Sequence, residues 1–248
     1  MPPLRGLATV RPITGQRNVL WIISHPEAVD VRDCDDADLV FVASERFAAD
    51  LRTRTDTPVE VLLQATDHLR FVPGPPDPRY AHPITFVAKT REVMRPIVAD
   101  ALTAGLRPTI YGSGWEPFVD PALIASDHVS NDELPAVYRS AGVLLNDHWD
   151  TMRAWGFVSN RLFDALACAA PVVSDFLPEI RDLFDEAVGT YTEPTGLRTW
   201  IEAALADPAA ARGRSEVGRA RILAAHTFDH RARTLTAALT RNGLLAHT

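Results

Sequence analysis

Residues 142–175 read GVLLNDHWDTMRAWGFVSNRLFDALACAAPVVSD, and this stretch decides the fold. The short apolar run at 142–146 predicts a buried strand, residues 160–169 have the apolar spacing of a helix, and residues 171–174 predict a second strand. A strand, a helix and another strand in this order are typical of a βαβ unit with parallel strands. The stretch therefore predicts an α/β protein.

The same alternation continues on both sides of this stretch. Further strands are predicted at 18–23, 38–43, 59–63, 84–88, 108–111 and 188–191. Further helices are predicted at 45–54, 92–104, 132–141, 179–184, 195–206, 209–225 and 228–242, and Pro96 is expected to bend the second of these or delay its start. Helix caps are expected at Ser44, at Asn131 or Asp132, and at Ser159 or Asn160. Together these elements predict a Rossmann-like parallel sheet with helices on both faces, preceded by a smaller α/β part.

A proline-rich stretch separates the two parts. Residues 64–83 hold five prolines and little periodicity, which favours a linker. We therefore expect a shortened N-terminal part at 1–77, a Rossmann-like domain at 78–225 and a C-terminal helix at 226–248 that packs back toward the first part.

Composition excludes several classes of protein. Of the 248 residues 46% are hydrophobic and 23% charged, which is ordinary for a globular chain, and no apolar run approaches the 18 residues of a membrane span. The net charge of -7 argues against nucleic acid as a partner. The opening MPPLRGLATVRP lacks the apolar run of a leader, and Cys34 and Cys168 form no paired motif. These features together predict a cytoplasmic protein.

A glycine turn follows the strand predicted at 108–111. Gly112-Ser113-Gly114 begins like a dinucleotide fingerprint but lacks the third glycine, which leaves NAD binding and an oxidoreductase as a weaker alternative. Two interpretations of the turn stay open: a simple tight turn, or a backbone left bare so that a ligand can lie against it.

A polar cluster follows the strand predicted at 142–146, at the edge where α/β sheets bind ligands. Asn146 ends the strand, and Gly156 allows close approach of the backbone before the next helix begins. Arg161 lies in the first turn of that helix, where a cation is unfavourable unless an anion such as a phosphate lies nearby. Asp164 follows three residues later, either to pair with Arg161 or to bind a ribose diol.

These motifs together resemble the donor-binding segment of group 1 glycosyltransferases with the GT-B fold, especially the CgeB-like branch. The resemblance rests on Asn146, His148, Gly156 and the run Arg161-Leu162-Phe163-Asp164-Ala165-Leu166-Ala167-Cys168. It extends to Ile110-Tyr111-Gly112-Ser113-Gly114-Trp115 and to His226-Thr227-Phe228-Asp229-His230-Arg231. Three residues depart from the family pattern: Asp164 replaces Glu, while Ala88 and Ala169 stand where Gly is usual.

The resemblance implies a set of site residues. Substrate binding is expected at Lys89, Arg91, Arg95, Gly112, Gly114, Trp115, Asn146, Gly156, Ser159, Asn160 and Asp164, and catalytic roles at His148 and Arg161. Surface exposure of Lys89, and a hydrogen-bonded imidazole at the core edge for His148, are the structural alternatives.

The function implied is transfer of a sugar from a nucleotide diphosphate sugar to an acceptor, without a metal or another cofactor. Because only about 75 residues precede the expected Rossmann-like domain, most of an acceptor domain is expected to be missing. The alternative is a non-catalytic nucleotide-sugar-binding module, or a subunit completed by a partner chain or a second copy.

Overall fold

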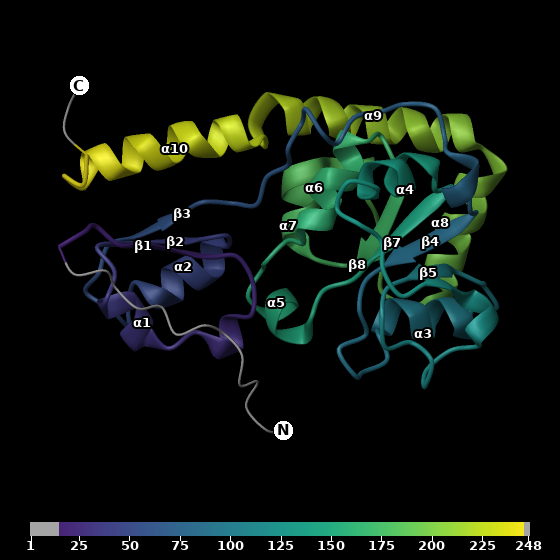
Figure 1. The fold of residues 1–248 in the computed structure, drawn as a ribbon, viewed down its shortest axis with the longest axis horizontal. Coiled ribbons are helices and arrows are strands. Elements are labelled where there is room, and N and C mark those ends of the chain that lie inside the picture. Colours follow the sequence, from purple (N-terminus) through teal and green to yellow (C-terminus); the bar gives the residue numbers. More distant parts are fainter. Residues whose placement is uncertain (1–14, 246–248) are drawn as a thin grey trace. The chain divides into compact units, whose positions relative to one another are not determined.

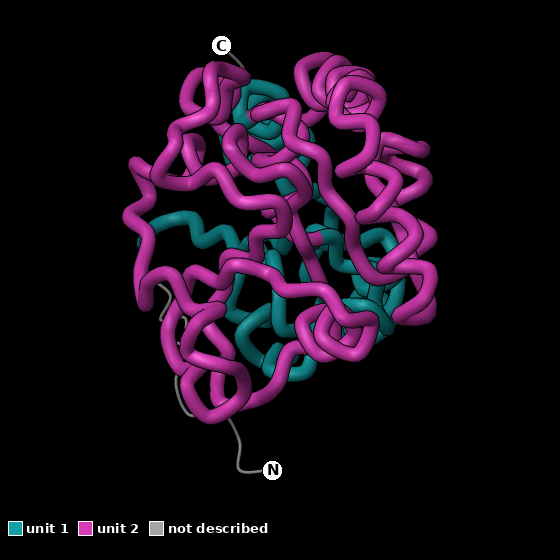
Figure 2. The backbone as a smooth tube through the Cα atoms, turned by 90° about the vertical axis from the view of Figure 1, so that its right-hand side faces the viewer, with its two compact units in different colours: residues 1–64, 148–158, 228–248 teal, residues 65–147, 159–227 magenta. Residues whose placement is uncertain are grey.

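The computed structural model describes residues 15–245 and divides them into two compact units (Figure 2). The first unit, teal in the figure, comprises residues 15–64, 148–158 and 228–245; the second, magenta, comprises residues 65–147 and 159–227. The chain therefore crosses between units at 64/65, 147/148, 158/159 and 227/228. These bounds differ from the expected 1–77, 78–225 and 226–248. The opening residues 1–12, from which the absence of a leader was inferred, lie outside the described residues.

The second unit is built on a six-stranded parallel sheet in the order β6-β5-β4-β7-β8-β9. Its strands are β4 (Ile84–Val87), β5 (Thr109–Tyr111), β6 (Ile124–Ser126), β7 (Val143–Asn146), β8 (Val172–Asp175) and β9 (Gly189–Tyr191). Strand β4 comes first in the sequence and lies in the middle of the sheet, which is the doubly wound order of Rossmann folds. The predicted α/β class with a parallel sheet is confirmed.

Helices cover both faces of this sheet (Figure 1). Ile97 and Leu197 pack with Phe86 in one core cluster. Leu144 and Val172 are fully buried, and each lies next to a strand residue that belongs to this cluster. Because successive side chains of a strand point to opposite faces of the sheet, Leu144 and Val172 point to the other face, where α6 contacts β7 and β8. The helices of the unit are α3 (Pro96–Thr103), α4 (Leu134–Ser140), α6 (Asn160–Ala167), α7 (Pro178–Phe184), α8 (Pro194–Ala206) and α9 (Pro208–Ala225).

The first unit has a three-stranded parallel sheet in the order β1-β2-β3. It comprises β1 (Val19–Ile22), α1 (Val31–Asp35), β2 (Leu39–Val42), α2 (Glu45–Leu51), β3 (Val59–Val61), α5 (Asp150–Ala154) and α10 (Phe228–Arg241). The Ser44 hydroxyl accepts from the Phe47 N–H at 3.2 Å, so the predicted cap of α2 is confirmed. Ala238 of α10 packs with Phe41 of β2, which explains why this helix belongs to the first unit.

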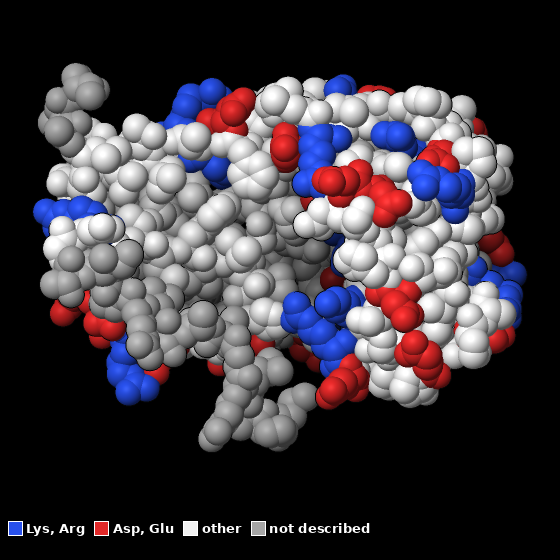
Figure 3. Space-filling model, in the orientation of Figure 1, with Lys and Arg blue, Asp and Glu red and all other residues white. Residues whose placement is uncertain are grey.

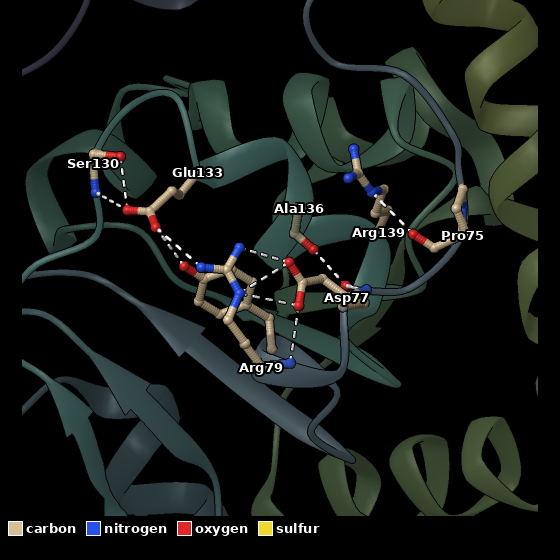
Figure 4. Close-up of polar contacts among 9 residues, drawn as sticks. Pro75, Asp77, Arg79, Ser130, Glu133, Ala136 and Arg139 are labelled. Carbon is tan, nitrogen blue, oxygen red and sulfur yellow. Dashed lines mark hydrogen bonds and ion pairs between the residues drawn. The ribbon is translucent and has the colours of Figure 1, made fainter.

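The proline-rich stretch is fixed to α4 within the second unit (Figure 4). Arg139 Nε donates to the Pro75 carbonyl at 3.1 Å, and the Asp77 N–H donates to the Ser140 hydroxyl at 2.8 Å. The Tyr80 hydroxyl donates to Glu133 at 2.7 Å. From residue 65 onward, the expected linker is therefore part of a compact unit.

Two helix starts bear on the sequence prediction. Helix α3 begins at Pro96, the residue expected to bend this helix or delay its start, because proline lacks an N–H and suits the first turn. Helix α4 begins after Glu133, so the expected cap at Asn131 or Asp132 is wrong; the Asp132 carboxylate accepts instead from Arg70 at 3.1 Å. The short elements β6, α1 and α5 were not predicted.

Candidate functional site

The candidate site lies at the carboxyl ends of β4 and β7, within the second unit. From β4 the chain continues to β5 on one side of the sheet, and from β7 it continues to β8 on the other. Doubly wound sheets bind ligands at such a reversal of strand order, because the two connecting loops leave a crevice between them. Both loops carry residues predicted for the site: Arg95 after β4 and Asn146 at the end of β7.

Asn146 is the buried centre of a polar network. Its side-chain Nδ2 donates to the Ser174 hydroxyl on β8 at 2.9 Å, and its Oδ1 accepts from Arg161 Nη1 at 2.7 Å. The Ser174 hydroxyl in turn donates to Asp175 at 2.9 Å. The network therefore joins the ends of β7 and β8 to the first turn of α6, and it fixes the direction of the Arg161 guanidinium.

Arg95 and Asp147 form a buried ion pair. Arg95 Nε donates to Asp147 Oδ2 at 3.1 Å, and Arg95 Nη2 donates to Asp147 Oδ1. Burial lowers the pKa of Arg95 and raises the pKa of Asp147, while the attraction between the two charges opposes both shifts. Because the Asp147 carboxylate neutralises the charge of Arg95, this arginine helps to position the loops of the site but adds little net charge to it.

Two guanidinium groups lie over one aromatic ring. The Cζ atoms of Arg95 and Arg161 are 6.0 Å and 5.7 Å from the centroid of Phe86, a residue of β4. Their proximity contributes to the lowered pKa of Arg95. In the described part of the chain no carboxylate pairs with Arg161, whose hydrogen-bonded partner Asn146 is neutral. Arg161 is therefore a cation of the site without an ion pair, although Asp147 and Asp164 lie near enough to interact with its charge.

The loop after β4 carries two more cations, Lys89 and Arg91, both exposed. Within residues 15–245 the Lys89 ammonium makes no ion pair. Thr90 anchors this loop, because its N–H donates to the Ser113 carbonyl at 3.2 Å and its hydroxyl to the Gly114 carbonyl at 3.0 Å. Around the six-stranded unit, acidic and basic side chains are interspersed in the view of Figure 3.

The glycine turn after β5 is shaped by contact with this loop. Gly112 has φ 140°, and a Cβ there would lie 2.2 Å from the Ala88 carbonyl oxygen. Gly114 has φ 84°, and its Cβ would lie 2.6 Å from the Thr90 hydroxyl. The Trp115 indole is fully buried and donates to the Ala88 carbonyl at 2.8 Å. The glycines are thus explained by close approach of the chain itself, and Trp115 supports the turn from the core.

The start of α6 holds the remaining predicted residues of the second unit. Ser159 occupies the N-cap position. Asp164 is 8% exposed; it accepts from Asn160 Nδ2 at 2.8 Å and from the Thr66 hydroxyl at 2.6 Å. Burial raises the pKa of Asp164 to about 7. The alternative in which Asp164 pairs with Arg161 is not what the structure shows, because each has other partners.

Two predicted residues belong to the first unit. His148 is 3% exposed and begins the segment 148–158. Gly156 has φ 71° and its N–H donates to the Arg153 carbonyl at 3.2 Å, so it ends the turn that follows α5. These two residues therefore belong to a different compact unit from Arg161.

Several residues of the network were not predicted as site residues. Asp147, Ser174 and Asp175 follow or end buried strands at the same sheet edge, which is the signal that would have found them. Thr66 lies in the expected linker and had no such signal.

Among the described residues, no group of three or more His, Cys, Asp or Glu side chains has the arrangement of a metal site. No helix of residues 15–245 combines the length and apolar character needed to cross a membrane.

A family model described as glycosyl transferase-like matches residues 89–237, which is more than half of the chain. The chain belongs to this family. The matched segment contains residues 89–95 of the loop between β4 and α3, the network around Asn146 and the whole of α6. No curated protein sequence matches the chain.

Solved structures of glycosyltransferases share the fold. HepE from Anabaena, in complex with UDP-glucose, has a TM-score of 0.68 at 13% identity, over 90% of this chain and 72% of HepE. Sucrose-phosphate synthase from Thermosynechococcus elongatus has a TM-score of 0.61 at 18% identity, over 85% of this chain and 60% of the synthase. A glycosyltransferase from Rickettsia africae has a TM-score of 0.61 at 10% identity, over 84% of this chain and 64% of that protein. The predicted GT-B fold is confirmed, and the chain spans less than two thirds of the synthase.

Proposed function

We propose that this member of the glycosyl transferase-like family transfers a sugar from a nucleotide diphosphate sugar to an acceptor. The observation that carries the proposal is Arg161: a partly buried cation at the ligand-binding edge of the sheet, held by the neutral Asn146. A guanidinium fixed in direction and lacking a carboxylate partner is suited to a phosphate, which it can bind with charge-assisted hydrogen bonds.

The diphosphate would be bound by groups from two loops. Arg161 and the N–H groups of the first turn of α6 approach from one side, and Lys89 and Arg91 approach from the loop after β4. Helix N–H groups and cations stabilise the negative charge that develops on the departing nucleoside diphosphate. The Asp147–Arg95 pair holds the β4 loop to the end of β7, and so positions these cations.

The resemblance to the CgeB-like branch supports a reaction without a metal ion, in which these cations replace one. We expect activity to survive EDTA for this reason. Activity that EDTA abolishes and Mn²⁺ restores would overturn this part of the proposal.

The donor is proposed to be a UDP-sugar or another nucleoside diphosphate sugar, and the HepE complex with UDP-glucose makes UDP the first ligand to test. Calorimetry of the whole chain with UDP, GDP, ADP and pyrophosphate tests the site directly. We expect at least one nucleoside diphosphate to bind with micromolar affinity. Heat and thermal stability unchanged by all of them would refute the donor site.

Release of the nucleoside diphosphate from the bound sugar nucleotide then separates an enzyme from a binding module. Binding with turnover supports the transferase. Binding without turnover, in the presence of a range of acceptors, supports a nucleotide-sugar-binding module, in keeping with the share of HepE and of the synthase that the chain spans.

A further inference from the structure

Asp164 makes contacts that the family resemblance does not explain. The resemblance places a longer glutamate here and implies a ribose ligand. In this chain the shorter carboxylate is 8% exposed, and both of its oxygens already accept hydrogen bonds from the unit itself. Oδ1 accepts from the fully buried Thr66 hydroxyl at 2.6 Å, and Oδ2 accepts from Asn160 at 2.8 Å.

Thr66 is the second residue after the chain enters the second unit at 64/65. Its N–H donates to the His226 carbonyl at 3.1 Å, and it forms an isolated parallel bridge with Thr227. Thr227 is the last residue before the chain leaves the unit at 227/228. The segment by which the chain enters the second unit and the segment by which it leaves are therefore paired with each other inside that unit. We call them the crossing segments.

The same two segments are also joined on the other side of the crossings. Within the first unit, Arg231 Nε donates to the Leu63 carbonyl at 2.6 Å and Arg231 Nη2 donates to the Gln64 carbonyl at 2.7 Å. The paired segments thus have an anchor in each unit: Arg231 for residues 63 and 64, and Asp164 for Thr66.

We propose that Asp164 is a positioning residue that fastens the paired crossing segments to helix α6 through the Thr66 hydroxyl. Asp164 lies three residues beyond Arg161 on the same helix, so the fastened helix is the one that carries the proposed phosphate ligand. The role of Asp164 rests on the proposed function only where nucleotide binding is compared.

The energetics of burial support this role. A carboxylate removed from water is stable only when hydrogen bonds or cations compensate it, and here Thr66 and Asn160 donate while Arg161 and Arg70 contribute positive potential. Removing the Thr66 hydroxyl leaves Oδ1 without this donor. Since a buried acceptor that loses its donor destabilises the folded arrangement, the crossing segment should then open more often.

Amide hydrogen exchange of the full chain, without ligand, tests the proposal. In Thr66→Val we expect exchange at residues 65–67 and 226–227 to become roughly tenfold faster, with strands β4 to β8 unchanged. Thr85→Val is the matched control: Thr85 is also fully buried, and its hydroxyl has no hydrogen-bond partner within the described residues. That variant should leave exchange in the crossing segments unchanged.

Asp164→Asn and the double variant Thr66→Val/Asp164→Asn complete the test. If one hydrogen bond links the two residues, the double variant should exchange no faster than the faster of the single variants. Unchanged exchange in Thr66→Val, or equal acceleration in Thr66→Val and Thr85→Val, would overturn the proposal.

Nucleotide binding distinguishes a ribose ligand from a positioning residue. A ribose ligand predicts that Asp164→Asn weakens UDP but spares pyrophosphate, and that Thr66→Val changes neither affinity nor exchange; this pattern would also overturn the proposal. If the wild-type protein binds no nucleoside diphosphate, the donor site fails while the exchange experiment still decides the role of Asp164.

Discussion

Replacing Arg161 with glutamine removes one positive charge from the sheet edge while keeping an N–H donor. In the structure Arg161 Nη1 donates to the buried Asn146 Oδ1 at 2.7 Å, and a glutamine amide can donate to the same oxygen. Loss of the charge-assisted contact to a diphosphate should cost about 1–2 kcal/mol of binding free energy, or roughly 5- to 30-fold in affinity. Because a cation in the first turn opposes the dipole of α6, the Tm of the ligand-free protein should stay equal or rise slightly.

Arg161→Ala separates the two roles of the side chain. It removes both the charge and the donor, and leaves Asn146 Oδ1 buried without this partner. An unpaired buried acceptor costs about 1–3 kcal/mol, so we expect a lower Tm as well as weaker binding. Arg107→Ala is the control, because Arg107 is an exposed arginine of the same unit, paired with Asp120 at 3.2 Å.

Calorimetry with UDP and pyrophosphate, together with thermal melts of the three variants, provides the assay. If Arg161→Gln binds UDP within twofold of the wild type while Arg161→Ala loses stability, Arg161 only anchors Asn146. That result would remove Arg161 from the ligand site and refute the reasoning behind the proposed function.

Three further predictions concern stability. Asp147→Asn should destabilise the protein by about 3–5 kcal/mol in chemical denaturation, because it leaves the buried Arg95 charge uncompensated; a loss below 1 kcal/mol would mean that the pair is hydrated in solution. Gly112→Ala should cost about 1–3 kcal/mol or more, since its φ of 140° and the Ala88 carbonyl 2.2 Å from the added Cβ both oppose a side chain; a Tm equal to the wild type contradicts this. Burial raises the pKa of Asp164 from 3.8 to about 7, so the folded state holds this proton more tightly than the unfolded chain, and the free energy of unfolding should fall as pH rises from about 4 to about 7. Asp164→Asn should flatten that part of the pH profile, and an unchanged slope would show that Asp164 ionises normally.

Local sequence patterns were sufficient to predict most elements of the fold. The apolar run at 84–88 became β4, and Ser44 capped α2, because a strand pattern and a helix cap depend on residues close together in the chain. Strand β6 was missed for the same reason: it is three residues long and two of them are exposed, so it has no apolar pattern. Its place is set by pairing with β5.

The sequence by itself determined the class of the protein, the sheet edge at which a ligand is expected, and Arg161 as the cation at that edge. Only the tertiary structure decided the partners of these residues. Arg95 meets Asp147 across 52 residues of sequence because β4 and β7 are neighbours in the sheet. Asp164 meets Thr66 across 98 residues rather than Arg161 three residues away. Burial makes such partners specific, because a buried charge is stable only beside groups that compensate it, and those groups are brought together by sheet order rather than by sequence spacing.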